Sequence, residues 1–414
     1  MRIAFVVAVY PPEPEPSSVM AAELARAWVA AGHDVTVVCP VPNRPRGVVY
    51  AGFERRPWHV ADEGGVRVVR VASWLIGEQR RGRDRVLENA SFGLASAAAL
   101  LAEVRPDVAL VESWPVLAYL PLLAVARARG IPVVNYVKDV YPEAAVAAGV
   151  LPAGSRTARA LARLDALICR SAARNVVISE RQRDLLVQTR GLEPERCVII
   201  PDWVDLAAIR PFEGPSSFRA EIGVPEGAFV GMFAGTMGLA SGCDVLVDVA
   251  ERLKGDPRIR LVCVGQGMLQ AKMAEAKAAR GLDNLVLLPF QPRERVSEVQ
   301  SSADVMLLTS SPAMGASSVP SKLITYLAVG KPVICGVAQV SDIADLVRGA
   351  DVGQVVPAGD APALAAALVA LADSPREVRE ALGRRARQVA VERHSLASAV
   401  ERFGALLGGL GLPS

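Results

Sequence analysis

Short runs of valine and isoleucine alternate with stretches of helical periodicity along most of the chain. Continuous apolar runs are typical of strands that are buried on both faces, as in parallel sheets covered by helices. The pattern predicts strands at Ile3–Tyr10, Val35–Cys39, Val66–Val71, Asp107–Val111, Pro132–Val137, Asn175–Ile178, Cys197–Ile200, Phe229–Ala234, Arg260–Val264, Leu285–Phe290, Val305–Thr309, Pro332–Val337 and Gln354–Val356. One open sheet rarely holds so many strands, so more than one sheet is expected.

Helical patterns fill most of the intervals between these strands. They are predicted at Ser18–Ala31, Val86–Val104, Leu117–Arg129, Ser155–Ala173, Cys243–Lys254, Met268–Arg280, Arg293–Ser301, Ser321–Ala328, Asp342–Val347, Ala361–Asp373, Arg376–Val391 and Leu396–Leu407. The alternation breaks at Pro201–Pro225, where prolines, glycine and paired serines are typical of a linker. The predicted fold class is therefore α/β, with two facing Rossmann-like domains, each a doubly wound parallel sheet.

The expected boundaries are residues 1–205 for the first domain and 206–392 for the second. Residues 393–414 are expected to form a C-terminal helix that packs back on the first domain. Ligands of such sheets bind beyond the carboxyl ends of the strands, so chemistry is expected in an interdomain cleft. The loops that would line it follow Tyr10, Val137, Ala234, Val264, Phe290 and Thr309.

The composition is that of a globular protein with a large core. The 414 residues exceed the length at which one core stops growing, 51% are apolar, and the net charge of +3 is too small to predict nucleic-acid binding. The six cysteines lack metal-ligand spacing and are expected to be buried thiols. The apolar run after Met1 is not followed by a cleavage-like site, so no signal peptide is expected. No apolar run is long enough to predict a membrane span. A cytoplasmic protein is expected.

The segment Ser310–Pro332 carries the strongest chemical signal. A loop of small residues leaves a predicted strand and enters a helix with Pro320 in its first turn. The unpaired N–H groups and the dipole of such a helix favour an anion such as a diphosphate. Lys322 adds a positive charge one turn into the helix. An ordinary strand–loop–helix unit is the alternative interpretation.

Two glycine-rich turns, Gly235–Gly238 and Gly265–Gly267, each follow a predicted strand of the second domain. Glycines at such turns let backbone N–H groups approach a ligand closely. A plain strand-to-helix turn could carry the same residues. We interpret both turns as candidate parts of the anion site.

Asp139 and Glu143 follow a strand of the first domain. Carboxylates there could bind acceptor hydroxyls or stabilise a positively charged sugar ring, or they could satisfy a helix dipole. Asp139 is the preferred acceptor-side residue. The basic stretch Arg80–Arg85 precedes the amphipathic Val86–Val104 and could rest on an anionic membrane. A solvated charged face is the alternative.

The order and spacing of these segments resemble the retaining GT-B glycosyltransferases. Ser317–Val333 is similar to their donor-binding segment, and its sequence most resembles that of the bacterial branch that builds colanic acid and O-antigen polysaccharides. The resemblance extends over nearly the whole chain, through Tyr10–Pro12, Glu23–Ala25, Gly32–Val38, Lys138–Glu143, Ile200–Asp205, Ala234–Gly238, Val264–Gly267 and Phe290–Glu294.

This resemblance implies retaining transfer of a sugar from a nucleotide-diphosphate sugar to an acceptor hydroxyl, in glycan, glycolipid or secondary-metabolite biosynthesis. Uracil is the expected base, with guanine and thymine as alternatives. The catalytic candidates are Lys322 and Asp139. The donor-binding candidates are Gly235, Thr236, Gly238, Gly265, Gln266, Gly267, Gln291, Arg293, Ser317, Ser318, Val319, Ser321 and Thr325. The acceptor-binding candidates are Pro12, Ser17, Ser18 and Glu143.

The chain departs from the family pattern in two places. The family commonly has two glutamates at the positions of Ser317 and Thr325, so Thr325 could offer the ribose only a weaker hydrogen bond. The family's arginine and lysine on the glycine-rich loop fall at Thr236 and Ser241. Lys322 and Arg293 would then remain as the cations for the diphosphate.

The sequence also limits the chemistry that is expected. No Asp-x-Asp pair lies at a strand end, so no metal and no cofactor besides the nucleotide-sugar co-substrate is expected. A departing phosphate oxygen could take the acceptor proton, since no histidine–carboxylate base is visible. A nucleotide-sugar 2-epimerase on the same fold and a non-catalytic nucleotide-sugar-binding partner subunit remain alternatives. The acceptor could be a glycan, a lipid-linked saccharide or a small molecule.

Overall fold

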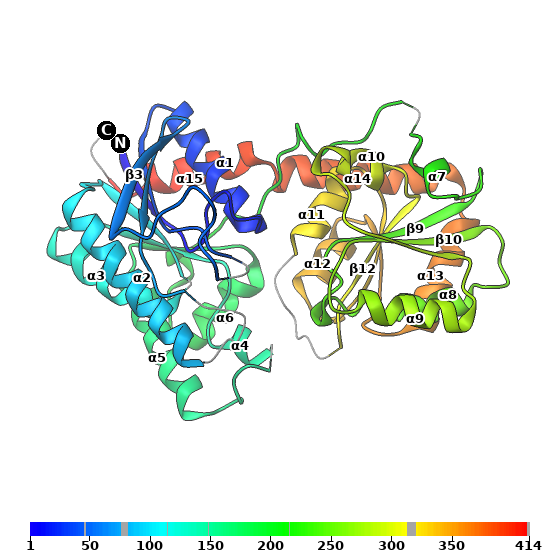
Figure 1. The fold of residues 1–414 in the computed structure, drawn as a ribbon, viewed down its shortest axis with the longest axis horizontal. Helices are drawn as coiled ribbons and strands as arrows, with labels where there is room; N and C mark the ends of the chain where they lie inside the picture. The colour runs from blue at the N-terminus through cyan, green and yellow to red at the C-terminus, as the bar shows by residue number, and fades with distance from the viewer. Residues whose placement is uncertain are drawn as a thin grey trace. The chain divides into compact units, whose positions relative to one another are not determined.

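The computed structural model describes residues 1–44, 47–75, 82–113, 115–147, 149–214, 216–312 and 320–411. The chain forms two compact units (Figure 1), one of Met1–Pro201 with Leu396–Ser414 and the other of Asp202–Ser395. The boundaries expected from the sequence, residues 205 and 392, lie within a few residues of these. The C-terminal helix belongs to the first unit, although the second unit precedes it in the sequence.

The first unit is built on an eight-stranded sheet with the order β3-β4-β2-β1-β5-β6-β7-β8. Its strands are β1 (Arg2–Val6), β2 (Asp34–Pro40), β3 (Trp58–Glu63), β4 (Val66–Val71), β5 (Val108–Glu112), β6 (Val133–Val137), β7 (Arg174–Val177) and β8 (Cys197–Ile199). Neighbours pair in parallel except β3, which runs antiparallel to β4 at the edge. The sheet is therefore doubly wound, as the alternating pattern predicts.

Helices cover both faces of this sheet. They are α1 (Pro16–Ala30), α2 (Gly82–Ala102), η1 (Val116–Ala118), α3 (Tyr119–Ala128), α4 (Glu143–Ala147), α5 (Arg156–Ser171), α6 (Glu180–Arg190), η2 (Pro194–Arg196) and α15 (Leu396–Gly408). On one face, the Trp28 ring of α1 lies 5.8 Å from Phe5 and 5.6 Å from Phe403 of α15. The apolar sides of α2, α3 and α5 pack on the opposite face (Figure 1). The aromatic contacts of Phe403 fix the C-terminal helix to the first unit.

The second unit contains a six-stranded, all-parallel sheet with the order β11-β10-β9-β12-β13-β14. Its strands are β9 (Phe229–Ala234), β10 (Ile259–Val264), β11 (Leu285–Leu288), β12 (Val305–Thr309), β13 (Val333–Val337) and β14 (Gly353–Pro357). Its helices are α7 (Phe218–Glu221), η3 (Leu239–Ser241), α8 (Val245–Arg252), α9 (Gln270–Arg280), η4 (Arg293–Arg295), α10 (Val296–Ser301), α11 (Ser321–Ala328), α12 (Asp342–Gly349), α13 (Ala361–Asp373) and α14 (Arg376–Arg393).

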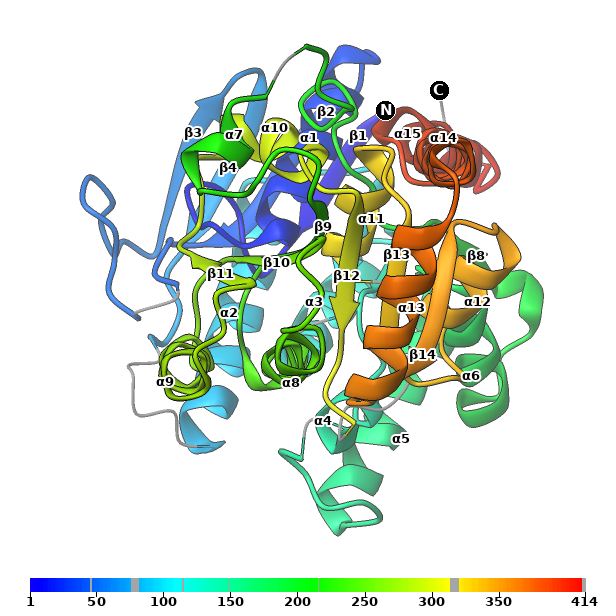
Figure 2. The same ribbon diagram turned by 90° about the vertical axis from the view of Figure 1, so that its right-hand side faces the viewer.

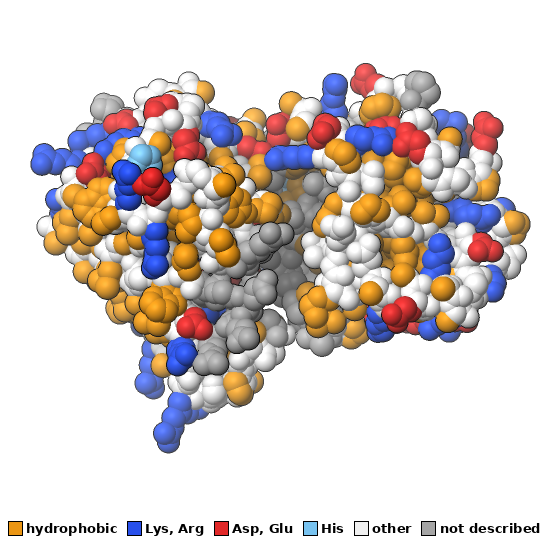
Figure 3. Space-filling view, in the orientation of Figure 1, with side chains coloured by type: hydrophobic (Ala, Val, Ile, Leu, Met, Phe, Trp, Pro, Cys, Tyr) orange, Lys and Arg blue, Asp and Glu red, His pale blue; other side chains and the backbone are white. Residues whose placement is uncertain are grey.

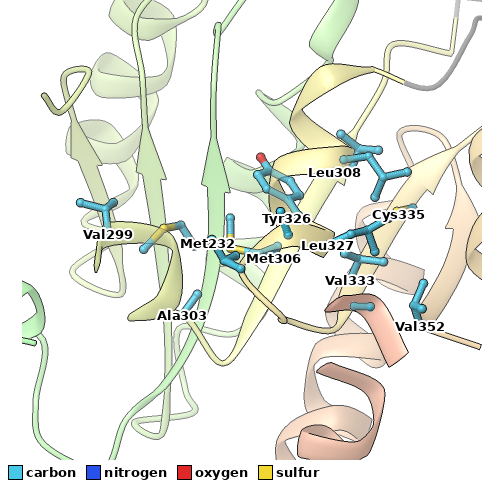
Figure 4. Close-up of a cluster of buried hydrophobic side chains, with 14 of the residues drawn as sticks. Met232, Val299, Ala303, Met306, Leu308, Tyr326, Leu327, Val333, Cys335 and Val352 are labelled. Atoms are coloured by element: carbon cyan, nitrogen blue, oxygen red, sulfur yellow. The ribbon is translucent and has the colours of Figure 1, made fainter. Parts of the chain in front are cut away.

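Alternate residues of these strands enter two separate cores. Met232 and Met306 pack with α10, α11, α12 and α14 on one face (Figure 4), whereas Phe233 and Leu307 pack with α8, α9 and α13 on the other. Figure 2 shows α13 in front of this sheet, and α8 and α9 beside it. Because all six strands are parallel, their carboxyl ends lie at one edge of the sheet.

Among the differences from the sequence prediction, three concern β3, the segment Pro201–Pro225 and the start of α11. Strand β3 was not predicted because it lies at the sheet edge, where its side chains are exposed or half-buried and polar residues interrupt the apolar pattern. The segment Pro201–Pro225 is not a free linker: Phe218 is fully buried in the second unit, and Arg219 forms an ion pair with Asp304 at 2.7 Å. Pro320 precedes α11 at the N-cap position instead of lying within its first turn.

The six cysteines are free thiols, and each is buried, as predicted. Burial raises the pKa of the Cys39 thiol to about 12, so this group stays protonated near neutral pH. In the part of the chain that the structure describes, none of the helices has the length and apolarity needed to cross a membrane.

Candidate donor-binding site

The candidate site lies at the carboxyl edge of the second sheet, where α11 meets the turns that follow β9 and β10. The Lys322 side chain lies directly over Gly235: a Cβ at this glycine would be 3.0 Å from Lys322 Cε and 3.3 Å from Nζ. Lys322 Nζ also donates to the carbonyl oxygen of Thr236 at 3.5 Å and lies 4.7 Å from the centroid of the Phe233 ring. The structure thus joins two segments that are far apart in the sequence.

The two glycine-rich turns pack backbone against backbone. A Cβ at Gly265 would lie 1.9 Å from the carbonyl oxygen of Gly235, and one at Gly267 would lie 2.5 Å from that of Met237. Gly265 also has a φ of 153°, a backbone angle that residues with a side chain rarely adopt. The Met237 N–H donates to the carbonyl of Gln266 at 2.9 Å. Glycine is therefore needed for this close contact, which holds both turns beside Lys322.

Tyr326 fixes α11 to the end of β9, a role that the sequence pattern does not indicate. Its hydroxyl donates to the carbonyl oxygen of Ala234 at 2.7 Å and accepts from the Ala234 N–H at 2.9 Å. Figure 4 shows the Tyr326 ring within the apolar core, with Met232 and Met306 below the ring. Because Tyr326 follows Lys322 by one helical turn, the same bonds set the position of the ammonium group.

The electrostatics of this corner favour an anion. Burial lowers the pKa of the Lys322 ammonium, and among the described residues no carboxylate forms an ion pair with it. Helix α11 begins at Ser321, so the unpaired N–H groups of its first turn lie beside Lys322. An uncompensated cation next to a helix N-terminus is suited to hold phosphate oxygens.

The remaining donor-side candidates occupy different places around this corner. Thr325 donates its hydroxyl proton to the Lys322 carbonyl at 2.8 Å, so its oxygen can still accept a hydrogen bond. Gln291 donates to the Pro289 carbonyl at 3.1 Å, and Arg293 is exposed at the start of η4. Thr236, Gln266 and Ser321 are exposed, and Gly238 is half-buried. Ser317, Ser318 and Val319 lie outside the described residues.

In the first unit, Asp139 and Glu143 follow β6. Asp139 is exposed, whereas both carboxylate oxygens of Glu143 accept from Arg190, at 2.9 and 2.6 Å. Arg190 is buried and also donates to Asp165 at 2.6 Å. The Glu143 carboxylate is therefore committed to a buried ion-pair network that orders the loop. Asp139 is the better placed of the two to reach a solute.

The other acceptor-side candidates lie near the start of α1. Pro12 is exposed and Ser17 is half-buried, but Ser18 is fully buried on the inner face of the helix. Contrary to the sequence prediction, an acceptor cannot reach Ser18 in this arrangement. Glu13, which sequence reasoning did not single out, is buried and accepts from the N–H groups of Asn43 and Arg44 at 2.9 Å each. Burial raises the pKa of the Glu13 carboxyl.

Two family models match the chain, one on each unit. The first, described as a glycosyl transferase 4-like domain, matches residues 17–203. The second, described as glycosyl transferases group 1, matches residues 216–389. The second match contains the glycine-rich turns, Lys322 and Tyr326.

Relatives and solved structures agree with these matches. WcaI of Escherichia coli, named as a colanic acid biosynthesis glycosyl transferase, is 26% identical over 73% of this chain and 75% of its own length. The glycosyltransferase WbjE of Pseudomonas aeruginosa is 29% identical over 63% of this chain and 65% of its own.

Two solved structures share the fold over nearly the whole chain. Sucrose-phosphate synthase from Thermosynechococcus elongatus superposes with a TM-score of 0.74 at 17% identity, covering 99% of this chain and 98% of its own. HepE from Anabaena superposes with a TM-score of 0.71 at 15% identity, covering 99% and 100%. Together with the two matched domains, this likeness places the protein among the GT-B glycosyltransferases that join a glycosyl transferase 4-like domain to a group 1 domain.

Proposed function

We propose that this glycosyltransferase is a retaining enzyme that takes a sugar from a nucleotide-diphosphate sugar, with uracil as the base, and transfers it to an acceptor hydroxyl. The observation that carries the donor assignment is the Lys322 ammonium, which extends from the first turn of α11 over Gly235 and has no carboxylate partner among the described residues. This position matches the charge of a diphosphate.

The choice of uracil is supported by proteins of the same fold. HepE from Anabaena has been solved with UDP and with UDP-glucose, and trehalose-6-phosphate synthase from E. coli with UDP-2-fluoro glucose. Their sequence identities to this chain are low, so they support the base as a proposal and leave the sugar open.

In the proposed reaction the bond between the anomeric carbon and the diphosphate oxygen breaks, and the sugar ring gains oxocarbenium character. Lys322 and the N–H groups at the start of α11 stabilise the negative charge that develops on the leaving diphosphate. The acceptor hydroxyl attacks from the face that the diphosphate leaves, and its proton passes to a departing phosphate oxygen. Asp139 orients the acceptor hydroxyl. We propose that the protein groups supply this charge stabilisation without a metal ion.

Replacing Lys322 tests the assignment. The Lys322→Ala variant should lose turnover by a factor of about 10² or more, because one preorganised charge at a leaving group is worth that much. Lys322→Arg should recover part of it. Lys272 is a suitable control, since it is exposed and paired with Asp244 at 2.8 Å outside the site, so Lys272→Ala should keep full turnover. Turnover close to wild type in Lys322→Ala would contradict the proposal.

Product analysis separates this function from other activities of the fold. Incubation with UDP-sugar alone should give at most slow hydrolysis, whereas acceptor addition should give a glycoside with the anomeric configuration of the donor. An epimerised nucleotide sugar formed without acceptor would overturn the transferase assignment for this reaction. Full turnover after treatment with a metal chelator would support the metal-free step, and its loss would contradict that step.

We also propose that the first unit contacts anionic membrane surfaces, as an enzyme with a lipid-linked acceptor requires. On α2 the exposed side chains of Leu87, Leu94 and Leu101 recur every seventh residue and are 44%, 63% and 45% exposed. Apolar side chains are visible over the α2 and α3 face of this unit (Figure 3). Exposed arginines lie at the start of α2 and along α5 of the same unit; they are Arg83, Arg85, Arg156, Arg159, Arg163 and Arg170. Arg80 and Arg81 of the predicted basic stretch lie outside the described residues.

Apolar side chains beside arginines are typical of a surface that rests in a membrane interface. The protein should float with liposomes that contain anionic lipid at low salt, and a Leu87→Ser, Leu94→Ser double variant should not. Val378→Ser, which changes an exposed apolar residue of the second unit, is the matched control. Wild-type protein that stays at the bottom of the gradient would refute membrane contact.

A further inference from the structure

A second cavity of the donor domain lies at the opposite edge of the sheet from Lys322. Its volume is about 490 Å³, within the range of sites that bind small molecules. Phe229, Asp304 and Pro332 bring the amino ends of β9, β12 and β13 to its wall, and the start of α14 closes another side. Since Lys322 lies at the carboxyl ends of the same parallel strands, the two sites are separate.

The wall of this cavity is basic. Its five cationic residues are Arg219, Arg258, Lys331, Arg376 and Arg379, and its two acidic residues are Asp304 and Glu380. Three of the arginines have carboxylate partners. Arg219 pairs with Asp304 at 2.7 Å, Arg376 pairs with Glu380 at 2.7 Å, and Arg258 pairs with Asp256 and Asp373 from outside the wall.

Lys331 and Arg379 lack carboxylate partners among the described residues. Arg379 donates through Nη1 to the carbonyl oxygens of Leu371, Ala372 and Ser374, and its guanidinium carbon lies 5.6 Å from the centroid of the Phe229 ring. These bonds to the C-terminal end of α13 fix its position, and no carboxylate among the described residues neutralises its charge. Burial lowers the pKa of the Lys331 ammonium, and the attraction of Asp304, which is ion-paired with Arg219, does not offset that effect.

Another cavity of the same unit provides a comparison. It has a volume of about 460 Å³ and lies beside α8 and α9. Both of its basic residues are neutralised, Lys272 by Asp244 at 2.8 Å, and Arg280 by Asp248 at 2.6 Å and Glu251 at 2.9 Å. Cations that form no ion pair with a carboxylate of the described residues therefore distinguish the cavity at Lys331 from this one.

We propose that the cavity at Lys331 binds a small phosphorylated anion, with Lys331 and Arg379 as the groups that contact its phosphate oxygens. Two cations in the wall of one cavity, neither ion-paired with a carboxylate among the described residues, match the multiple oxygens and the charge of a phosphate or diphosphate group. This site is independent of the donor site and of the proposed transfer reaction.

Calorimetric titration with pyrophosphate tests the proposal if the donor site is removed first. In the Lys322→Ala variant, pyrophosphate should still bind, and adding Lys331→Met should weaken that binding on the order of tenfold or more, as expected for a lost charged hydrogen bond. Lys331→Arg should restore it. Lys272→Met, which changes the paired lysine of the other cavity, should leave it unchanged. Melting curves establish that each variant is folded.

Two results would overturn the proposal. One is that the Lys322→Ala variant fails to bind pyrophosphate. The other is equal binding with and without Lys331→Met. Citrate at matched ionic strength gives a further arm: binding as tight as that of pyrophosphate would contradict selectivity for phosphorylated anions. None of these results depends on glycosyl transfer, so failure here and failure of the proposed function are distinguishable.

Discussion

Removing the Tyr326 hydroxyl should loosen the donor corner without creating a cavity. Strand β9 pairs with β12 only as far as Met232, and on its other side it pairs with β10. The Gly235 N–H donates to the carbonyl of Val264, so the N–H and C=O of Ala234 point away from β10. The Tyr326 hydroxyl satisfies both groups at this place.

The cost of Tyr326→Phe follows from this geometry. The substitution leaves two backbone groups next to a fully buried ring without their partner, and an unsatisfied buried group costs about 1–3 kcal/mol. Partial hydration lowers the sum, so about 2–4 kcal/mol is expected. For a unit of this size that corresponds to a fall in melting temperature of about 5 °C or more. Because α11 carries Lys322, the KM for the donor should rise several-fold while the acceptor KM stays constant.

Tyr119→Phe is the matched control. Tyr119 is also fully buried, but its hydroxyl has no hydrogen-bond partner among the described residues, so this change should leave the melting temperature unchanged or raise it. Thermal melts followed by circular dichroism and initial rates at varied donor concentration measure both quantities. A Tyr326→Phe variant with the melting temperature and donor KM of the wild type would refute the positioning role.

Three further predictions follow from the same contacts. Gly265→Ala should destabilise the second unit by about 3 kcal/mol or more, because its Cβ would meet the facing carbonyl at 1.9 Å, whereas Gly255→Ala, with open space, should be nearly neutral in a thermal melt. The lowered pKa of Lys322 means that its charge is lost as pH rises, beginning below the usual 10.5, so donor KM should climb at alkaline pH and Lys322→Arg should shift that climb to higher pH; the same profile in both proteins would contradict this. Arg190→Met should lower the free energy of unfolding by about 3 kcal/mol, because it leaves the carboxylates of Asp165 and Glu143 without their ion-pair partner. An unchanged melting temperature would argue against this ion-pair network.

The lowered pKa of Lys322 also affects folding stability, which rises over the alkaline pH range in which donor binding weakens. Between the lowered folded pKa of Lys322 and the value of 10.5 in the unfolded chain, the unfolded state binds more protons. Charging Lys322 in the folded state therefore costs stability that returns as the group loses its proton at high pH. The donor diphosphate would offset that cost by supplying the missing counter-charge.

Local pattern alone determined much of this protein. The apolar runs identified β9, β12 and α11 with their observed bounds, because periodicity and buried alternation are written in neighbouring residues. The order of strands and helices was sufficient to predict two doubly wound units. The loop of small residues before α11 indicated Lys322 as the cation of the candidate site. Exposed elements such as β3 carry no such pattern, and so they were missed.

Tertiary structure decided what each side chain contacts. Tyr326 and Ala234 are 92 positions apart, and nothing near either residue in the sequence shows that a phenol would satisfy the end of β9. The sequence predicts Glu143 as an acceptor-binding residue, but in the structure Arg190, 47 positions away, donates to both of its carboxylate oxygens. The charge balance around Lys331 likewise depends on which carboxylates reach which arginines. Burial and ion pairing are sums over distant segments, so only the folded chain fixes them.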